Sequence, residues 1–276
     1  MDKIVLYCKS YRNDVHRLKV LLDSVIKYNR DGLKFYISCP EIDVDIFKQV
    51  LGNDGYELLT DEQIVSKLDI HGNKLSYINQ NFGWVQQQVV KSEFWKLDLC
   101  VNYLCLDSDM YFITDFYEHD FIYEGDTPYT VMHECKDLLQ FTSRNNMGFV
   151  RDSFVEDRKY VQNIFNRKGK PYDFGPTPVI WSRKVWESLK KDYLDPNGLT
   201  FLNLIEAKHC EFHWYGEWLL KKRPIDIVPI DQIFKNYHYR EQYEESIKLG
   251  DTEKTLSENF LGVALETTWG APLKYE

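Results

Sequence analysis

The sequence predicts an α/β fold in which helices flank a mostly parallel central sheet, and three observations support this class. Apolar runs typical of buried strands alternate with helical patterns through the first half of the chain. The helical stretches between these runs are long enough to connect parallel strands. No repeat or low-complexity linker divides the 276 residues. We therefore expect a single domain over residues 1–276, with halves at 1–128 and 129–276 and an irregular second half.

The elements of the first half follow one another in a regular order. The run KIVLYC at 3–8 predicts a buried strand, and the apolar spacing after Asp14 predicts a helix from 14 to 29. A second strand at 34–39 stops at Pro40, which cannot continue the strand's hydrogen bonding. The remaining expected elements are a short helix at 43–51, a strand at 56–60, an amphipathic helix at 82–99 and a strand, a break and a strand within 102–113.

The second half mixes the two patterns with less regularity, so we expect an irregular arrangement there. Short apolar runs predict strands at 129–134, 178–182, 225–230 and 233–238. Helical patterns predict helices at 152–166, 183–193 and 215–222.

Composition and charge limit the classes of function. The formal net charge of −9 argues against nonspecific nucleic-acid binding, which depends on neutralising phosphates. No window approaches the roughly 18 apolar residues of a membrane span, and the N-terminal MDKIVLYCKSY does not resemble a signal peptide. The six cysteines form no C-x-x-C pair, which favours a reducing compartment and no structural zinc. We expect a cytoplasmic protein, and contact with the inner face of a membrane stays open.

Two aspartates, Asp107 and Asp109, interrupt the apolar run LCLDSDMYF at 104–112. A buried carboxylate without a partner is costly, so the pair needs a physical reason. Residues two apart in an extended chain point to the same side, so both carboxylates can face one cation. Oxygen ligands suit Mg²⁺ or Mn²⁺, and doubly wound sheets bind ligands at the carboxyl ends of their strands. We expect a divalent metal at this pair; structural capping is the alternative.

A second D-x-D, from Asp43 to Asp45, stands in a different context. It follows Pro40 and Glu41 in a polar stretch, so we interpret it as a solvated loop or helix start. The context of each copy, and not the pattern itself, therefore separates the two.

Several segments, in order, resemble those of the GT-A glycosyltransferases. They are VLYCKSYRNDVHRL, GWVQQQVVKSEFWKL, LCLDSDMYF, GPTPVIWSRKVWESL and EFHWYGEW. The likeness covers most of the chain and points to a mostly bacterial branch of this fold. It implies a Rossmann-like GT-A sheet, with the nucleotide bound by residues 1–128 and the acceptor by residues 129–276. The resemblance further implies that the C-terminal tail closes over the donor.

The resemblance also implies roles for the paired aspartates and for a histidine. In GT-A enzymes the motif holds a divalent metal on the diphosphate of a nucleotide-sugar, and its central residue, here Ser108, lies near the ribose or the metal. A histidine near the C-terminus often supplies a third ligand, a role that suits His238. The alternative for His238 is a structural histidine with satisfied hydrogen bonds. His133 and His213 are weaker candidates.

Candidate donor-binding residues come from two segments. The turn CKSYRND occupies the place where GT-A folds bind the base and phosphates, so Lys9, Tyr11 and Arg12 are expected to contact the donor; a solvated basic turn is the alternative. Trp84, Gln87 and Lys91 share one helix face because they are spaced three and four residues apart. In this interpretation that face contacts the diphosphate or the sugar of the donor. The spacing is equally compatible with a helix face that is simply exposed to solvent.

A glycosyltransferase that inverts stereochemistry needs a carboxylate to accept the proton of the acceptor hydroxyl. The resemblance places Glu211 and Glu217 near the acceptor, and we favour Glu211 over Glu217. Both residues have a structural alternative, because acidic side chains also stabilise the N-terminal ends of helices.

These features predict a metal-dependent glycosyltransferase that uses Mn²⁺ or Mg²⁺. It transfers a sugar from a UDP-, GDP- or CDP-sugar to a glycan or lipid-linked acceptor, as in surface polysaccharide assembly. A phosphatase of the D-x-D-x-T type fits poorly, because Tyr111 stands at the threonine position. A sugar nucleotidyltransferase usually has a Gly-rich loop after its first strand, and CKSYRND contains no glycine. A non-catalytic nucleotide- or sugar-binding protein is the third alternative.

Overall fold

The central sheet takes its strands mainly from the first half of the chain. The computed structural model describes residues 1–65 and 83–275. The strands of this sheet are β1 (Asp2–Lys9), β2 (Phe35–Cys39), β3 (Glu57–Thr60), β4 (Cys100–Leu106) and β8 (Val179–Ser182). They lie in the order β3-β2-β1-β4-β8, with β1 to β4 parallel and β8 antiparallel to β4. Leu6 of β1 lies between Phe35 and Leu104, so β1 is buried in the middle of the sheet.

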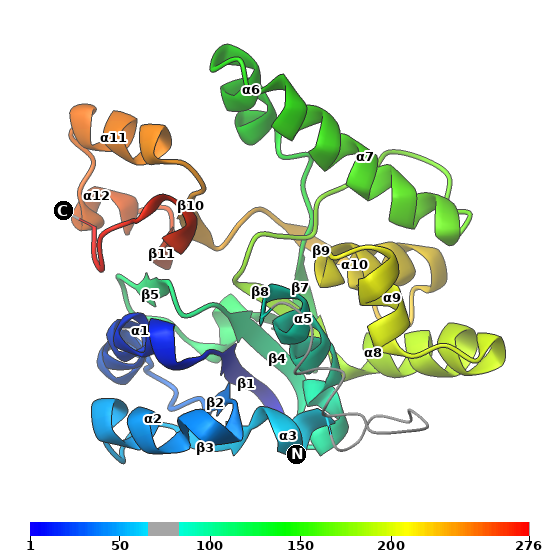
Figure 1. Ribbon diagram of the computed structural model, residues 1–276, viewed down its shortest axis with the longest axis horizontal. Helices are drawn as coiled ribbons and strands as arrows, with labels where there is room; N and C mark the ends of the chain where they lie inside the picture. The colour runs from blue at the N-terminus through cyan, green and yellow to red at the C-terminus, as the bar shows by residue number, and fades with distance from the viewer. Residues whose placement is uncertain (66–82, 276) are drawn as a thin grey trace.

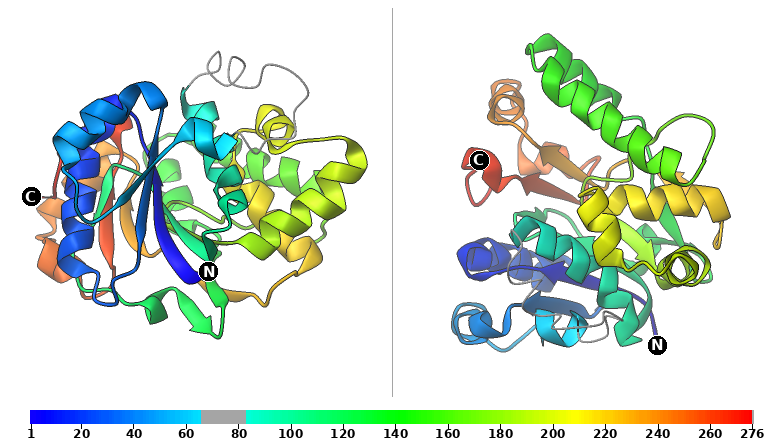
Figure 2. Two further views of the ribbon diagram at one scale, coloured as in Figure 1. Left: turned by 90° about the horizontal axis from the view of Figure 1, so that it is seen from below. Right: turned by 45° about the vertical axis from the view of Figure 1, so that its right-hand side comes forward.

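Helices cover both faces of this sheet (Figure 1). Those of the first half are α1 (Val15–Tyr28), α2 (Val44–Leu51), α3 (Asp61–Val65) and α5 (Gly83–Glu93). The connections through α1 and α2 step outward from β1 to β3, whereas the connection through α5 returns to β4 on the other side of β1. Right-handed connections that run in opposite directions across a sheet place their helices on opposite faces. Accordingly, α1 and α2 lie on one face and α5 on the other, as Figure 2 (left) shows.

Two three-stranded sheets extend the fold. The first contains β5 (Met110–Phe112), β10 (Phe234–Tyr237) and β11 (Gly262–Leu265) in the order β10-β11-β5. The second contains β6 (Ile122–Glu124), β7 (Thr127–Val131) and β9 (Val228–Ile230) in the order β6-β7-β9. The chain passes from β4 to β5 through residues 107–109, so this short link joins the central sheet to the first small sheet.

The remaining helices belong to the second half of the chain. They are α6 (Lys136–Arg144), α7 (Gly148–Ile164), α8 (Arg183–Leu189), α9 (Phe201–Ala207), α10 (Glu211–Lys222), α11 (Arg240–Lys248) and α12 (Glu253–Leu256). Trp186 of α8 packs against Tyr215 of α10 with ring centroids 5.0 Å apart. This aromatic contact holds the N-terminal part of α10 against the body of the protein.

The predicted α/β class is confirmed, with a central sheet that is mixed because of β8. The strands expected at 3–8, 34–39 and 56–60 correspond to β1, β2 and β3. The helices expected from 152 and 215 begin earlier, at Gly148 and Glu211. The helix expected over 82–99 ends at Glu93 and continues as a 3-10 turn to Leu97, while its expected first residue lies outside the described part of the chain.

Two findings concern the thiols and the helix lengths. All six cysteines are free, and Cys8, Cys39, Cys100 and Cys105 are buried in strands as small apolar residues. Within residues 1–65 and 83–275, no helix combines the length and the apolar character that crossing a bilayer requires.

Candidate functional site

A cavity of about 900 Å³ opens beyond the carboxyl ends of β1 and β4. Its wall includes the turn after β1, the link between β4 and β5, part of α5, and the segments before β8 and after β11. The residues predicted to bind donor or metal that lie on this wall are Lys9, Tyr11, Arg12, Gln87, Asp107, Ser108 and Asp109. The fold therefore gathers candidates from distant parts of the sequence around one space.

Asp107, the first residue after β4, is held by two side chains. Lys91 Nζ donates a hydrogen bond to its Oδ1, and Thr177 Oγ1 donates one to its Oδ2. The Lys91 side chain is 2% exposed, so its charge is withdrawn from water and directed at the carboxylate. Burial opposes ionisation of Asp107, but Lys91 and Thr177 outweigh it and hold the pKa of Asp107 below its usual value. Each carboxylate oxygen has two lone pairs, so Asp107 can still accept a further ligand.

Asp109 lines the same cavity in a different environment. Its Oδ2 accepts a hydrogen bond from the Thr267 N–H at 3.1 Å, and its main-chain oxygen accepts one from the Leu265 N–H at 2.8 Å. Burial raises the pKa of Asp109 to about 7, and the negative charges of Asp107 and Glu266 add to this effect. A cation that enters near neutral pH can therefore displace the proton of Asp109 into solvent at little cost.

His238 follows β10 and contacts the segment after β11. Its Nδ1 hydrogen-bonds to Oε1 of Glu266, a residue on the cavity wall. Burial opposes protonation of His238, but the bond to Glu266 outweighs it and raises the pKa of His238. The ligand atoms of Asp107, Asp109 and His238 do not all lie within 4.8 Å of one another. In the described part of the chain, such a group of possible metal ligands is found elsewhere, at His133, Cys135 and Asp173.

Glu211 is the first residue of α10 and does not line the cavity. Its Oε1 is 3.9 Å from Lys91 Nζ, and the side chains of both residues are buried. Burial raises the pKa of Glu211 to about 7, although Lys91 opposes this shift. Lys91, which we expected to meet the donor, is thus occupied by carboxylates of the protein itself and is not part of the cavity wall.

The other residues expected near the donor or the acceptor lie in three different settings. Both oxygens of Glu217 pair with the Arg167 guanidinium, including Nη2 to Oε1 at 2.7 Å, and Glu217 is buried outside the cavity. This ion pair stabilises the packing of α10 and gives Glu217 no contact with the site. Gln87 reaches the cavity from α5. Trp84 belongs to the same helix, but its side chain lies outside the described part of the structure.

The turn after β1 brings cations to the cavity that already have acidic partners. Arg12 donates to Asp43 twice, through Nε to Oδ1 at 2.6 Å and through its main-chain N–H to Oδ2 at 2.9 Å. Asp43 does precede a helix, α2, but it is buried by this pairing, so our expectation of a solvated second D-x-D was wrong for this residue. Lys9 Nζ lies 3.4 Å from Oδ2 of the buried Asp61.

Several residues of the site were not predicted from the sequence. Thr177, Glu266 and Thr267 line the cavity, and all three contact a predicted residue. Asp14, expected only to begin a helix, also lines the cavity together with Ser108. Two features of the sequence could have indicated these residues: the rigid GPTP turn that contains Thr177, and the position of Glu266 directly after an apolar run near the C-terminus. Neither feature indicates a site unless the fold is known.

Comparisons with known proteins place these observations in a family context. A protein-family profile described as "Family of unknown function (DUF6492)" matches residues 3–256. The match includes the link between β4 and β5, α10 and β10, and it ends before β11 and Glu266. No curated protein matches the chain.

Proposed function

The chain belongs to the DUF6492 family, and we propose that it is a metal-dependent glycosyltransferase of the GT-A fold. It transfers a sugar from a UDP-, GDP- or CDP-sugar to a glycan or lipid-linked acceptor in the cytoplasm, as surface polysaccharide assembly requires. One observation carries the proposal: Asp107 and Asp109 lie on the wall of a large cavity at the carboxyl ends of β1 and β4.

The position and size of the cavity support a nucleotide-sugar as the ligand. The strand order reverses at β1, which neighbours β2 on one side and β4 on the other. In open α/β sheets, ligands bind in the crevice at such a reversal, outside the carboxyl ends of the strands. Ligand cavities usually measure about 300–1,000 Å³, and a volume of about 900 Å³ leaves room for a nucleotide and its sugar.

The side chains around Asp109 fit a divalent cation that prefers oxygen. The carboxylates of Asp107, Asp109 and Glu266 are close enough that burial and mutual repulsion raise the pKa of Asp109 to about 7. A divalent cation relieves such repulsion, and oxygen ligands suit Mg²⁺ and Mn²⁺. We assign Asp107 and Asp109 as ligands, with His238 as a further ligand through Nε2 because Glu266 engages its Nδ1. When bound, the cation supplies positive charge for the departing diphosphate.

The remaining chemistry falls to the side chains of this chain. The bond between the anomeric carbon and the diphosphate oxygen breaks, and a bond forms to the acceptor oxygen, which gives up a proton. Lys9 and Arg12 place positive charge on the cavity wall, where it favours the phosphates. Glu211 is our candidate for the proton acceptor, since its pKa of about 7 makes it available as a base near neutral pH. This role requires the acceptor hydroxyl to reach the N-terminus of α10.

A thermal-shift experiment with nucleotides and metal tests the proposal. UDP, GDP and CDP are each added with and without Mn²⁺, and the melting temperature of the wild type is compared with that of Asp109→Asn. We expect one nucleotide to raise the melting temperature only when Mn²⁺ is present, and the variant to lose this response. Hydrolysis of the corresponding nucleotide-sugar then reports turnover. Equal responses of wild type and variant, or no response to any of the three pairs, contradict the proposal.

A further inference from the structure

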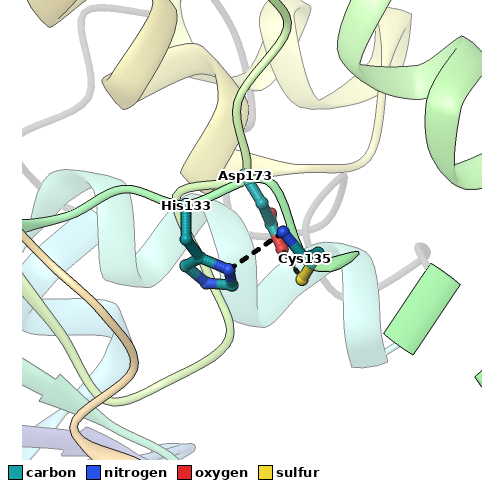
Figure 3. Close-up of side chains that lie close together, drawn as sticks. All are labelled: His133, Cys135 and Asp173. Carbon is teal, nitrogen blue, oxygen red and sulfur yellow. Dashed lines mark hydrogen bonds between the residues drawn. The ribbon is translucent and has the colours of Figure 1, made fainter. Parts of the chain in front are cut away.

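Three polar side chains, two after β7 and one on the segment that leads into β8, form a group. His133 and Cys135 follow β7, and Asp173 exchanges two main-chain hydrogen bonds with His133, at 2.8 and 3.1 Å. The Cys135 thiol donates to Oδ2 of Asp173 at 3.0 Å. Figure 3 shows the three side chains close together. By residue type the group resembles a metal site, so its hydrogen bonds decide what it does.

The hydrogen bonds of His133 indicate a structural role. Its Nε2 contacts the Gly175 carbonyl at 2.7 Å and so carries the proton, while its Nδ1 accepts the Cys135 N–H at 3.2 Å. A neutral imidazole has one donor and one acceptor, and both are in use here. His133 therefore has no free lone pair for a metal ion.

The surroundings of Asp173 also argue against a cation. Arg158 of α7 and His213 of α10 form ion pairs with its two oxygens, each at 3.5 Å. Burial opposes protonation of His213, but Cys210 and Asp173 outweigh it and raise the pKa of His213 to about 10. The carboxylate thus already lies between two positive charges, which would repel a metal ion. Asp173 instead ties α7 and α10 to the start of the segment 173–178.

This segment carries Thr177 to the cavity. Apart from the bridge between Asp173 and His133 it contains no regular secondary structure, and side-chain contacts hold its backbone at Gly175. Asp173 Oδ1 accepts the Gly175 N–H at 3.4 Å, and His133 Nε2 hydrogen-bonds to the Gly175 carbonyl. Two residues further on, Thr177 donates to Oδ2 of Asp107. Asp173 is therefore connected to the first aspartate of the candidate metal site through its contact with Gly175, the chain from Gly175 to Thr177, and the contact of Thr177 with Asp107.

We propose that Asp173 is a positioning residue that holds the segment 173–178 so that Thr177 stays against Asp107. The contact between Thr177 and Asp107 is present in the structure whatever the function is. Its importance for metal binding rests on the proposed function. Asp173 acts through the backbone at Gly175 and has no contact with the cavity of its own.

Hydrogen–deuterium exchange of the protein without added ligand tests the positioning directly. We expect Asp173→Asn to speed exchange in peptides covering 173–180 by about tenfold, because the segment opens locally. Glu217→Gln is the matched control, since it breaks a buried ion pair with Arg167 in which no residue of 173–178 takes part. Cys135→Ala, which removes one contact to Asp173, replaces Asp173→Asn if that variant does not fold. Unchanged exchange in 173–180, or an equal change in Glu217→Gln, overturns the proposal.

A double-mutant cycle on Mn²⁺ affinity tests the connection to the site. Asp173→Asn and Thr177→Val should each weaken Mn²⁺ binding by about tenfold, and the double variant should bind no more weakly than Thr177→Val. Additive losses would show that the two residues act separately and would overturn the proposal. If the wild type binds no Mn²⁺, the proposed function fails, while the exchange experiment still decides whether Asp173 positions Thr177.

Elemental analysis of the purified wild type distinguishes the remaining explanation. We expect no stoichiometric metal to depend on Cys135. One equivalent of zinc that disappears in Cys135→Ala would show that the group is a metal site, and the positioning proposal would be wrong.

Discussion

The ammonium of Lys91 hydrogen-bonds to Oδ1 of Asp107, so the first aspartate of the D-S-D link has a buried counter-charge within the protein. The same ammonium lies 3.9 Å from Oε1 of Glu211. Burial opposes protonation of Lys91, but Asp107 outweighs it and holds the pKa of Lys91 above its usual value. One cation from α5 therefore serves two carboxylates, one after β4 and one at the start of α10.

Replacing Lys91 by methionine should destabilise the protein strongly. Methionine has a similar length and no charge, so Asp107 and Glu211 lose their cation while staying in place. Removing one partner of a buried ion pair costs about 3–5 kcal/mol, because the other charge is left without compensation. We expect Lys91→Met to lower the free energy of unfolding by about this amount, measured by urea denaturation at pH 8.

The control for this substitution is the same change at an exposed ion pair. Lys34 lies 3.1 Å from Asp2, and both side chains are about half exposed. Lys34→Met should leave the denaturation curve nearly unchanged, since water screens such a pair. Similar denaturation curves for Lys91→Met and Lys34→Met would show that the charge of Lys91 contributes no more to stability than that of an exposed lysine.

Asp109→Asn should separate activity from stability. Burial and the neighbouring carboxylates raise the pKa of Asp109 to about 7, so ionising this group at pH 8 costs more in the folded protein than in the unfolded chain and lowers stability. The amide removes this charge, so the variant should melt at the same or a higher temperature than the wild type at pH 8 without metal. Its hydrolysis of the nucleotide-sugar should fall by about 100-fold or more, since the ligand that we propose for the metal is lost.

The second D-x-D provides the matched control for this experiment. Asp45 is exposed at the start of α2, and Asp45→Asn should change neither the melting temperature nor donor hydrolysis. If Asp109→Asn keeps full hydrolysis, or if Asp45→Asn loses as much, the assignment of the metal site to Asp109 is wrong.

Glu266→Ala should weaken Mn²⁺ binding through His238. Glu266 engages Nδ1 of His238, and partners that orient a metal-bound histidine in this way typically contribute 10- to 100-fold to metal affinity. We expect an affinity loss in this range, measured from the free Mn²⁺ signal in electron paramagnetic resonance, and no further loss in the double variant with His238→Ala. His119→Ala, at an exposed histidine, is the control and should bind like the wild type. Additive losses would show that Glu266 does not act through His238.

The sequence predicts the parts of the fold that have strong periodic patterns. The strand 3–8 and the helix after Asp14 are recovered because their apolar residues form one continuous core around β1. The aspartates 107 and 109 are recognisable because an apolar strand directly precedes them. In the structure both lie on the cavity wall, where the pattern places them at the carboxyl end of a strand.

The contacts around these residues could not be predicted, because they join segments far apart in the chain. Lys91 looked like one member of a helix face, and only the packing of α5 against α10 directs it to Asp107 and Glu211. Asp43 looked solvated until Arg12, from another connection, is seen to cover it. Pairings of this kind depend on tertiary structure, which a periodic pattern in one segment does not contain.

The pH dependence of stability tests the environment of Glu211. Its pKa is raised by burial from an ordinary value of about 4.5 to about 7, so the folded protein holds this proton more tightly than the unfolded chain. The stability from this group is therefore complete below pH 4.5 and is lost as the pH rises through 7, by up to about 3 kcal/mol. Glu211→Gln cannot ionise, so its free energy of unfolding relative to the wild type should increase between pH 5 and pH 8 in metal-free urea denaturation. Asp109 titrates in both proteins, so its contribution cancels in this comparison. If the difference in free energy of unfolding between Glu211→Gln and the wild type is equal at pH 5 and pH 8, Glu211 ionises at its ordinary pKa and is not tuned to act as a base.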